Sequence, residues 1–135
     1  LPGNSINHLN SFFVPSHNTR VFVSGEVDMV SGVGFKADRW PEGARRDLMD
    51  IRWVVSDLCV LDFDGPDRAV QVRSLHPGVT FEQVQQNTGF PLLKSAQLHE
   101  TVHPTEEQLA LIRRLDPHDY RATAIKGNPP GIRQA

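Results

Sequence analysis

The apolar positions in the first 75 residues come in short runs separated by turn residues, a pattern typical of β-strands. Residues 12–14 and 20–23 are such runs on either side of Pro15-Ser16-His17-Asn18, and residues 27–30 either extend the second run or form another strand. Three further β-rich runs follow at close spacing, at residues 51–55, 58–63 and 69–75. Their short connections predict an antiparallel meander.

The second half of the chain contains two helix-start signals. Thr80 with Gln83 and Thr105 with Gln108 both have the spacing of a capping box, in which a side chain at each end satisfies a free backbone amide. We therefore expect a short helix after residue 80 and a second helix after residue 105. The second helix should stop at Asp116, because Pro117 cannot continue it.

The length of 135 residues suits one domain, which we place at residues 1–125. Residues 126–135 are rich in Gly and Pro, and we expect a mobile tail there. The chain opens with Leu1-Pro2-Gly3-Asn4, which has the composition of the middle of a loop. We interpret the chain as a fragment of a longer polypeptide, whether made as such or released by proteolysis.

The charge balance argues against nucleic acid or a membrane as partner. Charged residues make up 22% of the chain and the net charge is −2, which gives no electrostatic reason to expect a polyanionic partner. No apolar run has the length of a membrane span. The single Cys59 rules out an internal disulfide and fits a reducing, cytoplasmic compartment, and its apolar neighbours indicate a buried structural thiol.

The segment from His99 to His103 has the letters of the zinc-protease motif H-E-x-x-H. That chemistry requires a helix, which brings two imidazoles four residues apart onto one zinc ion. Pro104 disfavours helical backbone at His103, and Thr105 is better placed as the N-cap of the next helix. In extended chain the two histidines would lie roughly 13 Å apart, so we expect a surface linker and no metal site.

Several segments in order resemble the β subunits of the family I CoA transferases, which include glutaconate and 3-oxoadipate CoA-transferases. They are Leu1-Pro2-Gly3 and residues 16–23, 26–35, 54–63, 74–80 and 83–90, and they cover residues 1–115. The most specific is the part from His76-Pro77-Gly78-Val79-Thr80 to Thr88-Gly89-Phe90. Within the family, the likeness is greatest to the β subunits of the steroid-ring-cleaving CoA hydrolases of bacterial cholesterol catabolism, on residues 3–8, 27–32 and 63–67.

The resemblance also implies where a ligand binds. Transferases of the family carry a run of glycines after Leu-Pro-Gly, whose amides hold the thioester oxygen. Here Gly3 remains, but Ser5 and Ile6 stand where further glycines are expected, so the loop must have another shape. Its side chains can supply donors for a carbonyl or carboxylate instead. Our candidate substrate-binding residues in this loop are Gly3, Asn4, Asn7 and His8.

A second candidate loop contains Ser31, Gly32 and Gly34, where glycine permits close approach of the backbone to the substrate or the pantetheine arm. Glu26 and Asp28 precede this loop two residues apart, and surface positions are the commoner fate of such residues. The glutamate that carries the chemistry in this family lies outside the matched stretch. We therefore assign no catalytic residue.

The resemblance implies an α/β fold, with an open, mainly parallel sheet, an antiparallel extension and C-terminal helices. It implies the C-terminal half of a β subunit that pairs with an α subunit and with its own missing N-terminal half, often as a heterotetramer, and binds acyl-CoA at the α–β boundary. The expected reaction is hydrolytic C–C ring opening of a steroid-derived CoA ester, with CoA as part of the substrate and no other cofactor. A transferase that moves CoA between small carboxylic acids and a non-catalytic partner-binding homologue are the alternatives. The isolated chain should be inactive.

Overall fold

The computed structural model describes residues 9–30, 32 and 34–123 of the chain, so the expected tail at residues 126–135 lies outside the described part. The strands are β1 (Leu9–Val14), β2 (Asp50–Ser56), β3 (Cys59–Asp62), β4 (Gln71–Leu75) and β5 (Leu93–Glu100). The α-helices are α1 (Phe81–Gln86) and α2 (Glu106–Leu115), and short 3-10 turns occur at Ala37–Arg39, Arg46–Leu48, Pro66–Arg68 and Tyr120–Thr123. No described helix is long and apolar enough to cross a bilayer.

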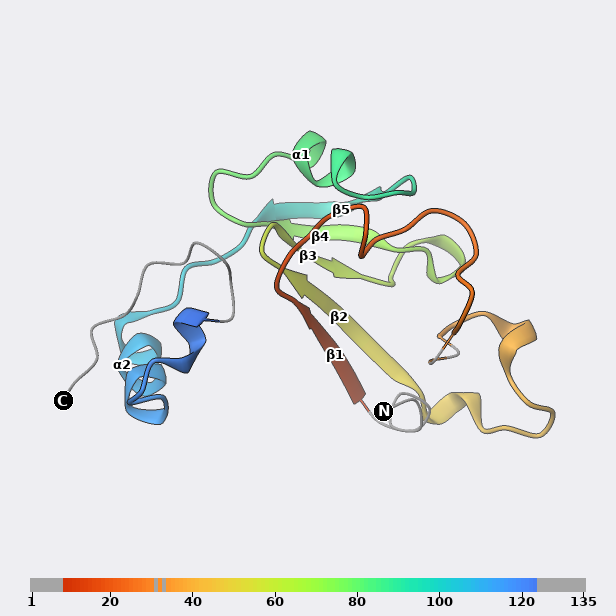
Figure 1. Cartoon of the computed structure of the whole chain (residues 1–135), viewed down its shortest axis with the longest axis horizontal. Helices are drawn as coiled ribbons and strands as arrows, with labels where there is room; N and C mark the ends of the chain where they lie inside the picture. Colours follow the sequence, from red (N-terminus) through yellow and green to blue (C-terminus); the bar gives the residue numbers. More distant parts are fainter. Residues whose placement is uncertain (1–8, 31, 33, 124–135) are drawn as a thin grey trace.

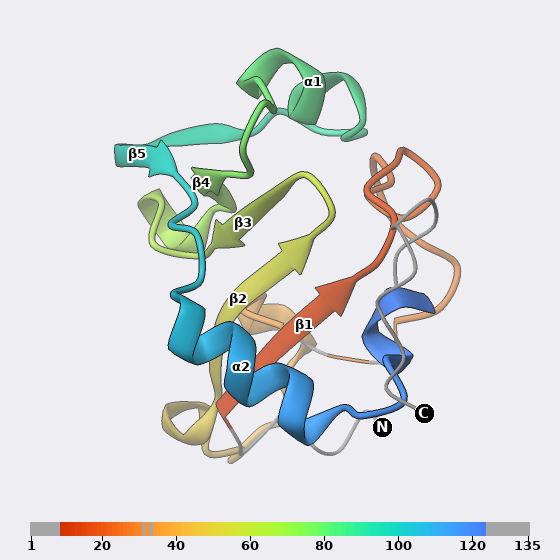
Figure 2. The same cartoon turned by 90° about the vertical axis from the view of Figure 1, so that its left-hand side faces the viewer.

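The five strands form one sheet in the order β1-β2-β3-β4-β5 (Figures 1 and 2). β1 pairs with β2 and β4 with β5 in parallel, whereas β3 is antiparallel to both of its neighbours. Four strands therefore run in one direction and β3 alone runs back. The α/β class is confirmed, and β2, β3 and β4 form the expected antiparallel meander.

The parallel strands β4 and β5 are connected through α1, which covers one face of the sheet (Figure 1). Thr80 accepts a hydrogen bond from the Gln83 amide while the Gln83 side chain accepts one from the Thr80 amide, so the predicted capping box is present. The helix buries Val84 completely against the core. That core consists of Cys59, Leu61, Val72, Val84 and Leu92.

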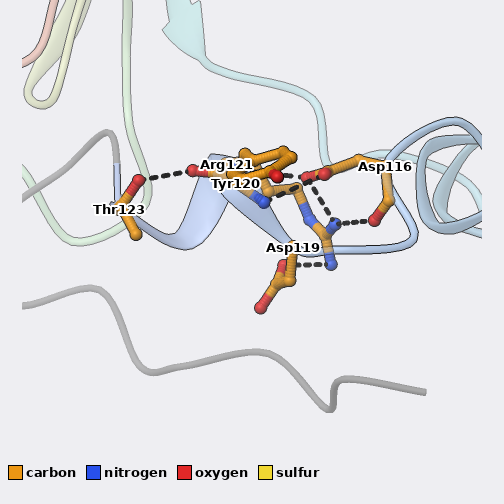
Figure 3. A network of polar contacts seen from close by, with 5 residues as sticks. All are labelled: Asp116, Asp119, Tyr120, Arg121 and Thr123. Atoms are coloured by element: carbon orange, nitrogen blue, oxygen red, sulfur yellow. Dashed lines mark hydrogen bonds and ion pairs between the residues drawn. The ribbon is translucent and has the colours of Figure 1, made fainter. Parts of the chain in front are cut away.

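The second predicted capping box, at Thr105 and Gln108, opens α2 as expected. No residue of α2 is buried, and the helix lies at the opposite end of the molecule from α1 in both views (Figures 1 and 2). The chain then turns at Asp116, whose carboxylate accepts hydrogen bonds from the amides of Tyr120 and Arg121 at 2.9 and 3.0 Å (Figure 3). These bonds lower the pKa of Asp116, so Asp116 ends α2 and organises the turn that follows.

Two of the strand predictions are wrong, and one strand was missed. Residues 20–23 form turns, because the Asn18 carbonyl accepts hydrogen bonds from the amides of Val21 and Phe22. Residues 27–30 are exposed and irregular. The strand β5 went unrecognised because most of its residues are exposed and Lys94, Gln97 and His99 interrupt its apolar pattern.

Candidate functional site

The loop with Gly34 lies at the edge of the sheet where β1, β2 and β4 begin. β3 runs in the opposite direction and ends at this edge, and Phe63 directly follows it. The ring of Phe35 packs on that of Phe63 with centroids 5.1 Å apart, and the guanidinium of Arg68 lies 5.4 Å from the Phe35 centroid. We call this edge the amino edge, since four strands begin here.

Gly34 has a φ of +60°, in the left-handed region that favours glycine. Its carbonyl accepts a hydrogen bond from the indole of Trp40 at 3.0 Å, which holds the loop in this shape. A Cβ at Gly34 would meet nothing within 4 Å, so the backbone at this residue borders open space. Gly32 is exposed on the same loop.

The carboxylate pair Glu26 and Asp28 shows no sign of a catalytic role in this structure. Glu26 is exposed and forms ion pairs with Lys36 at 2.8 Å and with Arg39 at 2.6 Å. Lys36, and then Arg39, lower the pKa of the Glu26 carboxyl. The Glu26 carboxylate therefore connects the segment before the loop to the residues after it. Asp28 is exposed, and both carboxylates are surface residues as expected.

Five of the candidate substrate-binding residues lie outside the described residues, namely Gly3, Asn4, Asn7, His8 and Ser31. The chain that carries the first four enters β1 at Leu9, which belongs to the amino edge. Gly32 and Gly34 belong to a loop at that same edge. The substrate-binding role of all seven residues stays a prediction.

The opposite edge of the sheet, the carboxyl edge, holds a buried cluster that sequence reasoning missed. β1 and β2 are parallel, so the segments that follow them meet here, and His17 lies beside Ser56 and Asp57. His17 is 5% exposed. Its Nδ1 lies 2.8 Å from Ser56 Oγ, its Nε2 lies 2.9 Å from Thr88 Oγ1, and its amide donates to Asp57 at 2.7 Å. The ring also stacks on Phe22 with a centroid separation of 4.0 Å.

The hydrogen-bond partners define the tautomer of His17. Thr88 Oγ1 donates to the Val84 carbonyl at 2.9 Å, so it accepts from the ring Nε2–H of His17. Nδ1 is then the acceptor, and Ser56 Oγ donates to it. Burial lowers the pKa of His17 more than the nearby Asp57 raises it, which favours this neutral form.

A second histidine is connected to the same serine. His76 Nε2 lies 2.8 Å from the Ser56 carbonyl and must donate to it, because a carbonyl only accepts. His76 Nδ1 lies 3.0 Å from Thr101 Oγ1, which in turn lies 2.8 Å from Ser74 Oγ. The ends of β2, β4 and β5 are thereby tied together at the carboxyl edge.

Both histidines are thus fully occupied in holding the fold. A general base needs a free lone pair within reach of a substrate proton, and neither ring nitrogen of His17 is available or exposed. We call His17, Ser56 and Thr88 the polar brace. It connects segments up to 71 residues apart in sequence, which is why no local pattern revealed it.

Cys59 confirms the expectation of a structural thiol. Its side chain is 0% exposed, and burial raises its pKa to about 11, despite a contact with Ser56 that acts in the other direction. A thiol of this pKa is almost entirely protonated near neutral pH and is a poor nucleophile.

The zinc-protease letters fall on strand and coil rather than on a helix. His99 belongs to β5, and His103 lies in the irregular segment before α2. His99 Nδ1 bonds to the Gln97 carbonyl at 2.9 Å. Within the described ranges, no group of three His, Cys, Asp or Glu side chains is arranged to hold a metal ion.

Comparison with known proteins identifies relatives over nearly the whole chain, although no family model matches it. The cholesterol ring-cleaving hydrolase IpdB subunit of Rhodococcus jostii (strain RHA1) is 46% identical over 121 residues, covering 89% of this chain and 47% of that protein. A 3-oxoadipate CoA-transferase subunit of Pseudomonas knackmussii is 38% identical over 74 residues, which is 55% of this chain and 28% of that protein. The chain therefore spans about half the length of the IpdB relative.

Two solved structures have the same fold. The crystal structure of Rhodococcus jostii RHA1 IpdAB matches with a TM-score of 0.80 and 45% identity, over 93% of this chain and 50% of that one. The crystal structure of glutaconate coenzyme A-transferase from Acidaminococcus fermentans matches with a TM-score of 0.64 and 25% identity, over 83% and 43%. The expected likeness to CoA-transferase subunits is confirmed.

Proposed function

The chain is a homologue of the cholesterol ring-cleaving hydrolase IpdB subunits, over about half of their length, and on this premise we propose that it is part of the β subunit of a hydrolase that opens a ring of a steroid-derived CoA ester. The observation that carries the proposal is the sequence identity to an IpdB subunit, sustained over nearly all of this chain and accompanied by the same fold as the IpdAB structure. Likeness in fold alone would leave the chemistry open, since one fold serves many reactions.

In the proposed reaction, water attacks a ring carbonyl carbon and the adjacent C–C bond breaks. The hydroxyl group remains on the carbonyl carbon, which becomes a carboxylate, and the carbon on the other side of the broken bond takes up a proton. The thioester is untouched, so the product retains its CoA. Negative charge develops on the carbonyl oxygen during attack, and hydrogen-bond donors placed at that oxygen lower the barrier.

This chain contributes binding and positioning to that reaction. We assign donor roles to Asn4, Asn7 and His8, which lead into β1 at the amino edge, and substrate contact to Ser31, Gly32 and Gly34. The open space above Gly34 supports such a contact. The polar brace lies at the carboxyl edge, where it fixes the ends of β1 and β2. It thereby fixes the orientation of both strands, whose first residues lie at the amino edge.

The proposal extends to the partner subunits, the cofactor requirement and the cellular location. The catalytic glutamate comes from elsewhere in the complex, namely from the α subunit or from the remaining half of this subunit, and the assembly is a heterotetramer. CoA enters as part of the substrate and no other cofactor is required. The single, buried Cys59 supports a reducing, cytoplasmic location.

A CoA transferase acting on small carboxylic acids is the second candidate, because the chain is also related to a 3-oxoadipate CoA-transferase subunit. A transferase needs its loop fitted to the thioester oxygen. The replacement of the expected glycines by Ser5 and Ile6 favours the hydrolase.

The test uses the complete subunit produced together with its α partner. We expect a CoA ester of a steroid-derived ring acid to be consumed without an added carboxylate acceptor, and the product to carry one added water and the intact CoA by mass spectrometry. Asn7→Ala or His8→Ala should slow this step by roughly ten- to a thousandfold, while His99→Ala, at an exposed strand position, should leave it unchanged. Exchange of CoA between two acids that depends on an acceptor would establish the transferase instead.

A further inference from the structure

The connection between β3 and β4, at the amino edge, contains a turn whose backbone is unusual for its sequence. Asp67 and Arg68 have φ values of +53° and +61°, both in the left-handed region. The Ala69 amide closes the turn by donating to the Pro66 carbonyl at 2.9 Å. Turns with two left-handed central residues favour Asn or Asp at the first position and Gly at the second. Asp67 follows this preference, whereas Arg68 stands where glycine is favoured.

The position of Arg68 is not explained by its contribution to the fold. A side chain on left-handed backbone destabilises the folded state relative to glycine, and residues of this kind persist mainly where they serve a function. The ion pair of Arg68 with Asp64 spans 4.0 Å between side chains that are 63% and 66% exposed, and such pairs contribute little to stability. The contacts of the guanidinium are therefore of interest.

The guanidinium of Arg68 reaches the loop that contains the candidate substrate contacts. It lies 5.4 Å from the centroid of the Phe35 ring, within the range of a cation–π interaction. Phe35 directly follows Gly34, whose carbonyl accepts the hydrogen bond from Trp40. The Phe35 ring also packs on Phe63, which begins the connection between β3 and β4. The loop is thereby held at Gly34 by Trp40 and at Phe35 by this connection.

We propose that Arg68 is a positioning residue, whose guanidinium acts through the Phe35 ring to hold the loop with Gly32 and Gly34 in the conformation that binds the CoA ester. The proposal rests on the proposed function, because that function makes this loop a substrate contact. A loop that is already ordered in its bound shape loses less conformational entropy when the substrate arrives, so the substrate binds more tightly.

The local charge does not favour direct binding of a CoA phosphate by Arg68. Asp64 lies 4.0 Å from the guanidinium, and Asp67 is the adjacent residue in the chain. Two carboxylates beside one guanidinium repel a further anion. Contact with the aromatic ring of Phe35 does not depend on a net positive charge at this point.

Arg68→Gly in the complete subunit, assembled with its α partner, separates positioning from stability. Glycine suits the left-handed backbone, so the midpoint of urea unfolding should be unchanged or higher than in the wild type. The KM for the CoA ester should rise about two- to fivefold, as expected for the loss of an exposed cation–π contact, with kcat nearly unchanged. An unchanged KM, or a lower unfolding midpoint, would overturn the proposal.

Asp67→Gly is the matched control, since it places glycine at the other left-handed position of the same turn and keeps the guanidinium. Its KM should equal that of the wild type. A rise as large as that in Arg68→Gly would assign the effect to the shape of the turn and refute the role of the side chain.

Phe35→Leu tests whether Arg68 acts through the ring. Leucine keeps an apolar side chain against Phe63 but removes the aromatic face that the guanidinium contacts. This variant should raise the KM at least as much as Arg68→Gly, and the double variant should have the KM of Phe35→Leu alone. Additive effects would show that Arg68 contacts the substrate directly, which contradicts the proposal.

Equilibrium binding of the same CoA ester to these variants requires no turnover and separates this inference from the proposed function. Weaker binding to Arg68→Gly, in a complex that transfers CoA to an acceptor, retains the inference and loses the hydrolase. An active hydrolase in which the wild type and Arg68→Gly bind the ester equally well does the reverse.

Discussion

Replacing His17 with alanine removes the centre of the polar brace, and the structure sets the size of the effect. The substitution deletes two side-chain hydrogen bonds, to Ser56 Oγ and Thr88 Oγ1, and the stacking of the ring on Phe22. It also leaves a cavity beside Cys59, which lies 3.8 Å from the imidazole. These contacts lie in the buried part of the fold, so water does not readily replace the lost hydrogen bonds.

The hydroxyl groups left behind limit the loss. Thr88 keeps its bond to the Val84 carbonyl, and Ser56 can donate to the Cys59 carbonyl at 3.3 Å instead. No buried hydrogen is then left unpaired, so each lost bond costs only about 1 kcal/mol. Adding the stacking and the cavity brings the expected loss of unfolding free energy to about 3 kcal/mol. His17→Phe keeps the volume and the stacking and loses only the two hydrogen bonds, so its expected loss is about 2 kcal/mol.

Urea unfolding of the intact complex, followed by tryptophan fluorescence, measures these values. The matched control is His99→Ala, which removes an exposed histidine bonded only to the nearby Gln97 carbonyl and should change the stability by less than about 0.5 kcal/mol. If His17→Ala proves as mild as His99→Ala, the brace does not stabilise the fold. Equal losses for His17→Ala and His17→Phe would show that the hydrogen bonds, rather than packing, account for the effect.

Three further outcomes follow from the same region. Burial lowers the pKa of His17 below its unfolded value near 6.5, so the contribution of this residue to the free energy of unfolding should be complete above pH 6.5. As the pH decreases below 6.5, the free energy of unfolding should decrease by at most about 1.4 kcal/mol per pH unit. Unfolding curves at several pH values should show this slope in the wild type and a weaker one in His17→Phe. Cys59, with a pKa of about 11, should resist iodoacetamide in the native complex at pH 8, where roughly one thousandth is thiolate, and react only on unfolding; rapid native labelling would contradict its burial. Gly89→Ala would place a Cβ 2.7 Å from backbone atoms of both Phe22 and Ser24, so a loss of about 1–3 kcal/mol in unfolding free energy is expected, and a neutral result would show that these segments are not packed so closely.

The features that the sequence predicts well are those determined within a few residues. Both capping boxes depend on a pair of side chains three positions apart, and both helices begin where Thr80 and Thr105 place them. The meander likewise follows from closely spaced apolar runs, with Ser56 Oγ accepting hydrogen bonds from the amides of Leu58 and Cys59 in its first turn. Pro117 ends α2 through its own covalent geometry.

The features that the sequence misses depend on distant parts of the chain. The run at residues 20–23 has strand-like composition, but the Asn18 carbonyl and the contact with Gly89 hold it as turns. β5 has a weak pattern of its own and is a strand because β4 pairs with it. His17 offers no local signal at all, since its partners are 39 and 71 residues away.

The position of the resembling segments in the fold bears on the choice between a hydrolase and a transferase. The segment that carries it most specifically, from His76 to Phe90, meets His17 and Ser56 at the carboxyl edge, where the side chains of His17, Thr88 and His76 form hydrogen bonds that hold strands together. Such segments indicate that the fold is shared, and a shared fold accommodates both hydrolase and transferase chemistry. The departures from the transferase pattern, at Ser5 and Ile6, occur in the chain that enters β1 at the amino edge. We therefore expect discrimination between the two reactions to come from that edge, and we expect variants at Asn7 and His8 to be more informative about the chemistry than changes in the polar brace.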